Sequence, residues 1–139
     1  MPSPAVEPAP PGRQALVLFG GAILGSVLGI VLGAPFGLDV GAGHPIFHVV
    51  VAVVVGLAAW WLRRHGTDNL ASRFAQWLAV ALAITQFVEG LAAIPDGSGD
   101  TIGHGIPGFL NLVVLQPLVL VAVIVLAIEA LRGRRAAGE

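Results

Sequence analysis

Four long apolar runs separated by short polar turns dominate this sequence and leave few folds open to it. Each run has about 20 residues, enough for a helix to cross roughly 30 Å of hydrocarbon. Together they account for most of the 139 residues, so little of the chain remains for a soluble domain. The runs cover residues 15–38, 44–62, 72–94 and 106–131.

The composition agrees with a lipid environment. Hydrophobic residues make up 56% of the chain and charged residues only 11%, whereas soluble domains carry about 25% charged residues. We therefore expect one membrane domain over residues 15–131, a disordered cytoplasmic tail over residues 1–14 and a basic cytoplasmic tail over residues 132–139.

The apolar runs are predicted to be helices. A run such as Val49–Val55 could also form a buried strand, but all four runs have helical length and lack the polar alternation of barrel strands. The sequence thus predicts an all-α integral membrane protein, a four-helix bundle with up-down-up-down topology.

The arginines predict the orientation of this bundle. The turns at 39–43 and 95–105 contain Asp39, Asp96 and Asp100 but no lysine or arginine. Basic residues favour the cytoplasmic side of short loops. We therefore expect a multi-pass protein of the cell membrane with both termini in the cytoplasm. The basic residues, all on the cytoplasmic side in this topology, are Arg13, Arg63, Arg64, Arg73, Arg132, Arg134 and Arg135.

Several function classes lose support from composition and motifs. The net charge of −1 and the absence of a basic groove argue against nucleic-acid binding. The chain has no cysteine, which excludes disulfides and thiolate metal sites. Phosphate-loop, nucleophile-elbow and His-Glu-x-x-His motifs are also missing. This pattern favours a protein that is not an enzyme by itself.

The first run carries a glycine at every fourth position. Residues four apart share one helix face, and such a face of small residues lets another helix approach closely in lipid. Two interpretations are open: packing of this helix within its own bundle, or self-association into a homo-oligomer. The glycines of this ladder are Gly21, Gly25, Gly29, Gly33 and Gly37.

Polar residues of three runs are predicted to meet at one depth near the non-cytoplasmic surface. His48 lies one turn inside the second run, about 6 Å from its start, and Glu89 and Asn111 each lie about 7.5 Å from the outer end of their runs. Ionisable groups in a membrane usually face the bundle interior, a cavity or a partner. An ionised, unpaired Glu89 would cost several kcal/mol in hydrocarbon, so we expect it to be protonated, paired with an imidazolium or hydrated.

The histidines allow a metal or haem hypothesis. His44 and His48 have the i, i+4 spacing that suits a shared metal, while Glu89 could add a carboxylate and His104 a third imidazole. Such a set favours zinc, iron or copper. A b-type haem with His104 as one axial ligand is the alternative. His44 and His104 could also be ordinary interfacial residues.

Further polar residues could extend this layer toward the middle of the membrane. Gln86, Asn111 and Gln116 could form a proton or water path, or simply hydrogen bonds between helices. Gln116 precedes Pro117, which removes a backbone donor and usually kinks a helix.

Three functions remain open from the sequence. The first is a redox or binding subunit that holds haem or a transition metal at the outer His/Glu site, in electron transport for example. The second is a non-catalytic accessory subunit that packs into a larger membrane complex through the glycine ladder. The third is a small oligomeric transporter or channel, with Glu89 lining the path.

Overall fold

The computed structural model describes residues 7–38, 42–94 and 110–136, and every regular element in these ranges is helical. Four helices are long and apolar enough to cross a membrane, which confirms the prediction of an all-helical four-span membrane protein. The long helices are α1 (Pro11–Gly33), α2 (Gly43–His65), α3 (Leu70–Ala92) and α5 (Gln116–Ala136); the short ones are the 3-10 helix η1 (Ala34–Phe36) and the π-helix η2 (Leu110–Leu115).

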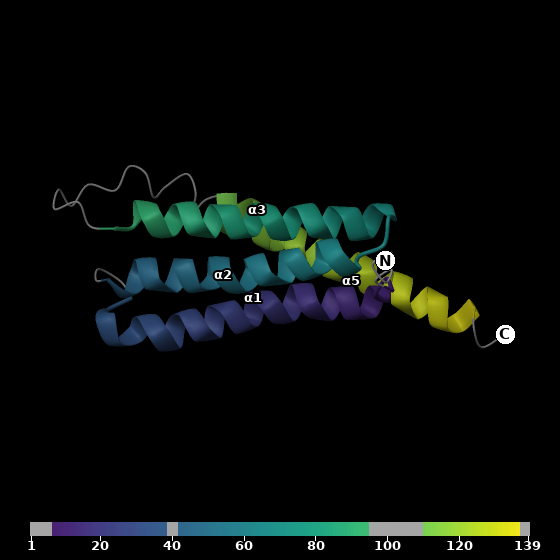
Figure 1. Ribbon diagram of the computed structural model, residues 1–139, viewed down its shortest axis with the longest axis horizontal. Coiled ribbons are helices and arrows are strands. Elements are labelled where there is room, and N and C mark those ends of the chain that lie inside the picture. Colours follow the sequence, from purple (N-terminus) through teal and green to yellow (C-terminus); the bar gives the residue numbers. More distant parts are fainter. Residues whose placement is uncertain (1–6, 39–41, 95–109, 137–139) are drawn as a thin grey trace, which may run out of the picture.

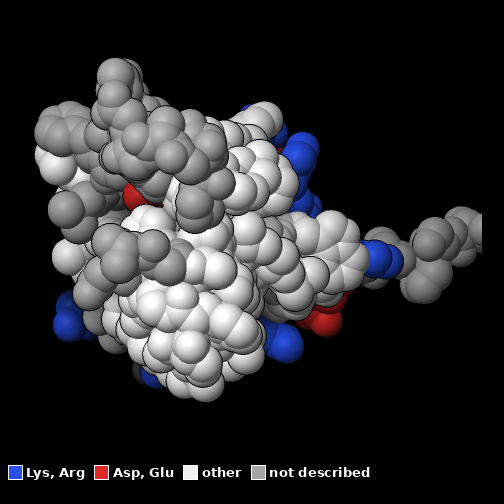
Figure 2. Space-filling view, turned by 90° about the vertical axis from the view of Figure 1, so that its left-hand side faces the viewer, with Lys and Arg blue, Asp and Glu red and all other residues white. Residues whose placement is uncertain are grey.

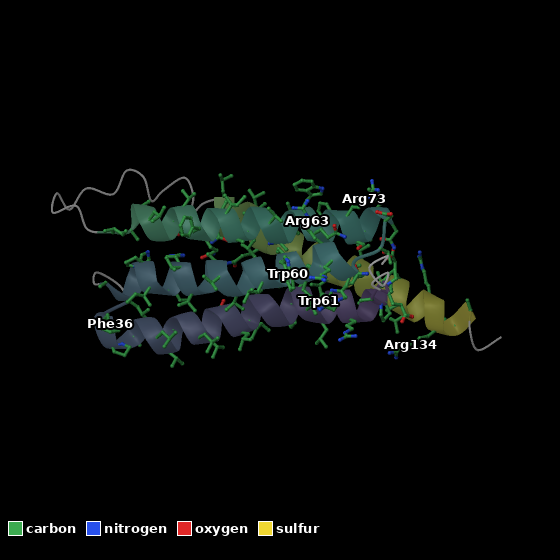
Figure 3. The ribbon with its side chains drawn as sticks, in the orientation of Figure 1. Phe36, Trp60, Trp61, Arg63, Arg73 and Arg134 are labelled. Atoms are coloured by element: carbon green, nitrogen blue, oxygen red, sulfur yellow. The ribbon has the colours of Figure 1, made fainter. Side chains whose placement is uncertain are left out.

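The helices α1, α2 and α3 lie side by side, and α5 passes behind them (Figure 1). The N-terminus and the end of α5 are at the same end of the bundle, where Arg63, Arg73 and Arg134 also lie, whereas Phe36 lies at the opposite end (Figure 3). Where described residues are visible on the end face near Phe36, most of the surface is uncharged, a small acidic patch lies beside the grey residues, and arginine side chains appear only around the margin (Figure 2). The bundle therefore has one arginine end and one end without described arginines.

The long helices extend beyond the predicted apolar runs, and the longest extensions are at the start of α1 and the end of α5. α1 begins at Pro11, four residues before the predicted start at Ala15, because proline is well tolerated in the first turn of a helix. α5 continues through the arginines to Ala136, since arginine is a good helix former and its charge is favourable at a helix C-terminus. Residues 106–109 of the fourth run lie outside the described ranges.

Aromatic and arginine side chains form a belt at the arginine end. Each of three guanidinium groups lies over an indole ring, an arrangement in which the cation is attracted to the face of the π-system. Such a belt is typical of the level where hydrocarbon meets water. The pairs are Arg13 with Trp61 at 5.4 Å, Arg63 with Trp77 at 5.5 Å and Arg64 with Trp60 at 5.5 Å from the ring centroid.

A closed cluster of hydrogen bonds joins the N-terminal segment to α3. Gln14 is fully buried, and its Nε2 donates to the Ala9 carbonyl at 2.8 Å. The Ser72 hydroxyl, also fully buried, donates to Gln14 Oε1 at 2.6 Å and accepts from Gln76 Nε2 at 3.2 Å. The sequence predicts a disordered tail through residue 14, and these bonds show that its last residues belong to the packed bundle.

Small residues let α1 and α2 pack closely. A Cβ atom built on Gly25 would lie 3.3 Å from the Val51 Cα, and one on Gly33 would lie 2.6 Å from the Gly43 carbonyl oxygen. Gly21 faces Ala58 in the same way, at 2.9 Å. The glycine ladder thus faces α2 of the same chain, while self-association stays a prediction. Gly37, after η1, has φ 80° and ends the helix, a conformation that favours glycine.

The α1–α2 contact leads to a stability prediction. A Cβ on Gly29 would lie 2.7 Å from the Phe47 ring and 3.0 Å from the Phe47 carbonyl oxygen. We expect Gly29→Ala to lower the free energy of unfolding by about 1–3 kcal/mol, because the two helices must move apart. Titrations with sodium dodecyl sulfate, which unfolds the protein, measure this change in the free energy of unfolding.

The control is Gly20→Ala in the same helix. A Cβ at Gly20 has no neighbouring atom within 4 Å, so this substitution changes helix propensity alone and should be neutral or slightly stabilising. Equal stability of the two variants would show that α1 does not depend on close contact with α2.

Candidate functional site

Four buried polar side chains from three elements meet between the helices. His48 comes from α2, Gln86 and Glu89 come from α3, and Asn111 comes from η2. They are only 6%, 4%, 9% and 5% exposed, respectively. Gln86 and Glu89 share a face because they are three residues apart on a helix. The predicted meeting of His48, Glu89 and Asn111 is present in the structure.

The His48 ring is held in place through its Nδ1 atom. Nδ1 lies 2.7 Å from Gln86 Oε1 and 3.6 Å from Glu89 Oε2. An amide oxygen can only accept a hydrogen bond, so Nδ1 carries the proton in this contact. In the neutral ring, Nε2 then keeps its lone pair, and no group within the described residues bonds to it. A histidine held in this way can offer Nε2 to a ligand.

Asn111 connects η2 to α3 and leaves one atom without a partner. Its Nδ2 donates to Glu89 Oε2 at 3.2 Å. Its Oδ1 is buried, and within the described part of the chain it has no hydrogen-bond partner. Since a buried acceptor without a partner costs about 1–3 kcal/mol, this oxygen marks a position where a donor would be favourable.

The position of Asn111 depends on the π-helical turn before Pro117. Proline has no N–H, and its ring collides with the carbonyl four residues earlier in a regular helix. The chain from Leu110 to Leu115 adopts the wider π-helix, a form that is rare and frequent at functional sites. The change from π- to α-helix falls at Gln116, directly before Pro117, where the sequence predicts a kink.

The polar side chains line a cavity of about 570 Å³, which we call the polar chamber. All four helices contribute to its wall, so it is a property of the whole bundle. The residues that line it are Ser26, Ile30, Leu38, His44, Phe47, His48, Val51, Gln86, Glu89, Asn111 and Gln116.

The His44 ring lies next to the His48 ring, but its Nδ1 atom contacts a backbone carbonyl. Its ring centroid is 4.7 Å from that of His48, as the i, i+4 spacing predicts. Its Nδ1 lies 3.0 Å from the Leu38 carbonyl oxygen, to which it can donate. His44 therefore also ties the start of α2 to the turn after α1.

A complete metal site is not formed by the described residues. No group of three or more His, Cys, Asp or Glu side chains that could hold a metal occurs within these ranges. His104, the third imidazole of the sequence hypothesis, lies outside them. The metal and haem hypotheses therefore stay predictions, with His48 as the best placed donor.

The sequence did not reveal the contribution of α1 to the site. Ser26 and Ile30 line the polar chamber, but the glycine ladder drew attention only to the packing face of this helix. Ser26 was the available signal: it is a polar residue in the middle of an apolar run, although its hydroxyl donates to the Ala22 carbonyl of its own helix at 2.9 Å.

No protein-family model, curated protein or solved structure matches this chain. The chemistry of the polar chamber is therefore the basis for the function proposed below.

The hydrogen bond between His48 and Gln86 leads to a prediction about the imidazole. We expect neutral His48 to be protonated at Nδ1 and expect Gln86→Leu to shift it toward the Nε2-protonated tautomer, because the acceptor for Nδ1 is lost. The ¹⁵N chemical shifts of histidine-labelled protein report this tautomer, and His48→Gln assigns the signals. Unchanged shifts in Gln86→Leu would show that Gln86 does not position the ring.

Proposed function

We propose that this chain is an intramembrane binding protein whose polar chamber holds a small molecule through His48, Glu89 and Asn111. The observation behind this proposal is that these buried polar groups line a space of about 570 Å³ and do not fully satisfy one another. A concave site with a few convergent polar groups is the usual form of a ligand site.

The contrast with the arginine end supports this proposal. There Gln14 and Ser72 bond to each other and to the backbone, as expected where polar side chains only hold helices together. In the polar chamber, Asn111 Oδ1 has no partner among the described residues. Thr67 Oγ1 at the arginine end is also buried without a partner among the described residues, but of these two residues only Asn111 borders the polar chamber, where a ligand could supply the missing donor.

Haem or a transition metal is a second candidate for the ligand. It is favoured by the His48 ring, whose Nδ1 is anchored by Gln86 at 2.7 Å, the arrangement in which metal-bound histidines are usually held. In this case His48 would supply one ligand through Nε2. The remaining hypotheses, an accessory subunit of a complex and a small oligomeric transporter, have no observation of comparable weight.

We further propose that the arginine end faces the cytoplasm, so that the polar chamber lies near the opposite surface. The support is that Arg63, Arg73 and Arg134 lie at one end of the bundle (Figure 3), together with the positive-inside rule.

Cysteine labelling tests this orientation, since the chain has no cysteine of its own. We expect a membrane-impermeant maleimide to label Ser98→Cys in intact cells, and Gly133→Cys only after the membrane is permeabilised. Gly133 is exposed at the end of α5, and a side chain there meets no neighbouring atom within 4 Å. Labelling of Gly133→Cys in intact cells would reverse the proposed orientation.

Extraction of the purified protein tests the binding function. We expect a bound organic molecule, haem or metal at about one per chain in the wild type, and its loss from Asn111→Leu, which removes a polar contact while keeping a similar volume. Mass spectrometry of the solvent extract, the absorption spectrum and metal analysis of the same preparation identify the ligand.

The matched control is Gln76→Leu. It removes a partly buried amide at the arginine end, outside the polar chamber, and should leave the bound molecule in place. A haem absorption band or stoichiometric metal would favour the second candidate. Equal contents in the wild type and Asn111→Leu would contradict the proposed binding site.

A further inference from the structure

The polar chamber offers acceptors to a ligand. The Asn111 amide donates one Nδ2 hydrogen to Glu89 Oε2, and its Oδ1 is a buried acceptor without a partner among the described residues. The His48 ring donates through Nδ1 to Gln86, which leaves the Nε2 lone pair in the neutral ring. A ligand that donates hydrogen bonds would satisfy these atoms, whereas a ligand with only carbonyl or ether oxygens would not.

A second cavity continues from the polar chamber toward the middle of the bundle. This apolar chamber has a volume of about 340 Å³, and the residues that it shares with the polar chamber are Ser26, Ile30, Val51, Gln86 and Gln116. On α1 the wall of the apolar chamber reaches from Phe19 to Ile30, which are eleven residues apart, or roughly 16 Å along a helix. The polar residues of this wall, Ser26, Gln86 and Gln116, are all shared with the polar chamber, and its other residues are apolar.

The apolar chamber opens toward the lipid side of the bundle. Its wall includes Ile23, Val27 and Leu120, which are 48%, 51% and 54% exposed. These residues come from α1 and α5, so the opening lies between these two helices. A molecule dissolved in the bilayer could therefore enter from the side without crossing water.

From these observations we infer that the ligand is a lipid-soluble molecule with a hydroxyl-bearing head, bound at Asn111 and His48, and a hydrocarbon tail in the apolar chamber. This inference rests on the proposed binding function and names the chemical class of the ligand. A hydroquinone or phenol with an alkyl chain and a hydroxyl-bearing glycerolipid share this chemistry.

The head should determine most of the affinity. A hydrocarbon tail gains little by moving from lipid into an apolar cavity, because lipid tails are as apolar as the wall. The apolar chamber acts instead by shape, since a bulky side chain placed in it would exclude the tail. The two parts of the ligand can therefore be tested separately.

The first test compares heads. Decylhydroquinone, kept under argon, and dioctanoylglycerol are titrated into the purified full-length protein in detergent, and the rise of the melting temperature yields an apparent Kd. We expect the dimethyl ether of decylhydroquinone to bind about tenfold more weakly than decylhydroquinone, because it has lost its donors. We expect Asn111→Leu to weaken the binding of decylhydroquinone by a similar factor.

The second test compares tails. Ala22 lines only the apolar chamber, and Ala127 on α5 is exposed and lines neither chamber. We expect Ala22→Phe to weaken decylhydroquinone about tenfold but to leave hydroquinone without a tail unaffected, which also shows that this variant is folded. Ala127→Phe should change neither probe.

The outcomes separate this inference from the proposed function. The inference would be overturned if Ala22→Phe and Ala127→Phe had equal effects on the binding of decylhydroquinone, or if the dimethyl ether bound as tightly as decylhydroquinone. It would also be overturned if decylamine, which has an amine head in place of hydroxyl groups, bound more tightly than decylhydroquinone. In those cases a response to Asn111→Leu would still support a ligand site in the polar chamber. If no probe responds to Asn111→Leu, the inference fails, and the extraction experiment described above decides the binding function separately. Whichever of decylhydroquinone and dioctanoylglycerol binds more tightly identifies the source of the hydroxyl head.

Discussion

Hydrocarbon offers no hydrogen bonds, and this constraint determines where every polar group of the four helices can lie. Backbone groups are satisfied within the helices. A buried polar side chain must find a partner in the protein, in water or in a ligand. In the described residues these side chains gather in two places, Gln14 with Ser72 near the arginine end and His48 with Gln86, Glu89 and Asn111 near the other.

The two clusters satisfy this constraint differently. Gln14 and Ser72 bond to each other, and Gln14 also bonds to the Ala9 carbonyl, which joins the N-terminal segment to α3. The His48 cluster is internally bonded on one side and lines a cavity on the other. The first arrangement joins helices of the bundle, and in the proposed function the second positions atoms for a ligand.

The space for this second arrangement depends on unequal helix packing. Glycines bring α1 so close to α2 that a Cβ on Gly29 would meet Phe47. Near the arginine end α1 also approaches α5, where a Cβ on Gly12 would lie 3.3 Å from that of Ala130. Between these contacts, the fourth span changes from the π-helical η2 to α5 next to Pro117, and both cavities are lined by residues of α1, α2, α3 and α5.

The sequence by itself determined the class of this protein, because apolar runs of membrane-spanning length can be satisfied only as helices in lipid. It also determined that His48, Glu89 and Asn111 lie near one depth, since depth follows from counting residues at 1.5 Å each. The depth of a residue in the membrane does not determine the direction in which its side chain points, however. Only the tertiary structure decided that Gln86 holds the His48 ring, that Asn111 Oδ1 has no partner among the described residues, and that α1 supplies Ser26 to the wall. These features depend on the rotation and spacing of whole helices, which result from all of their contacts together and not from any single run of residues.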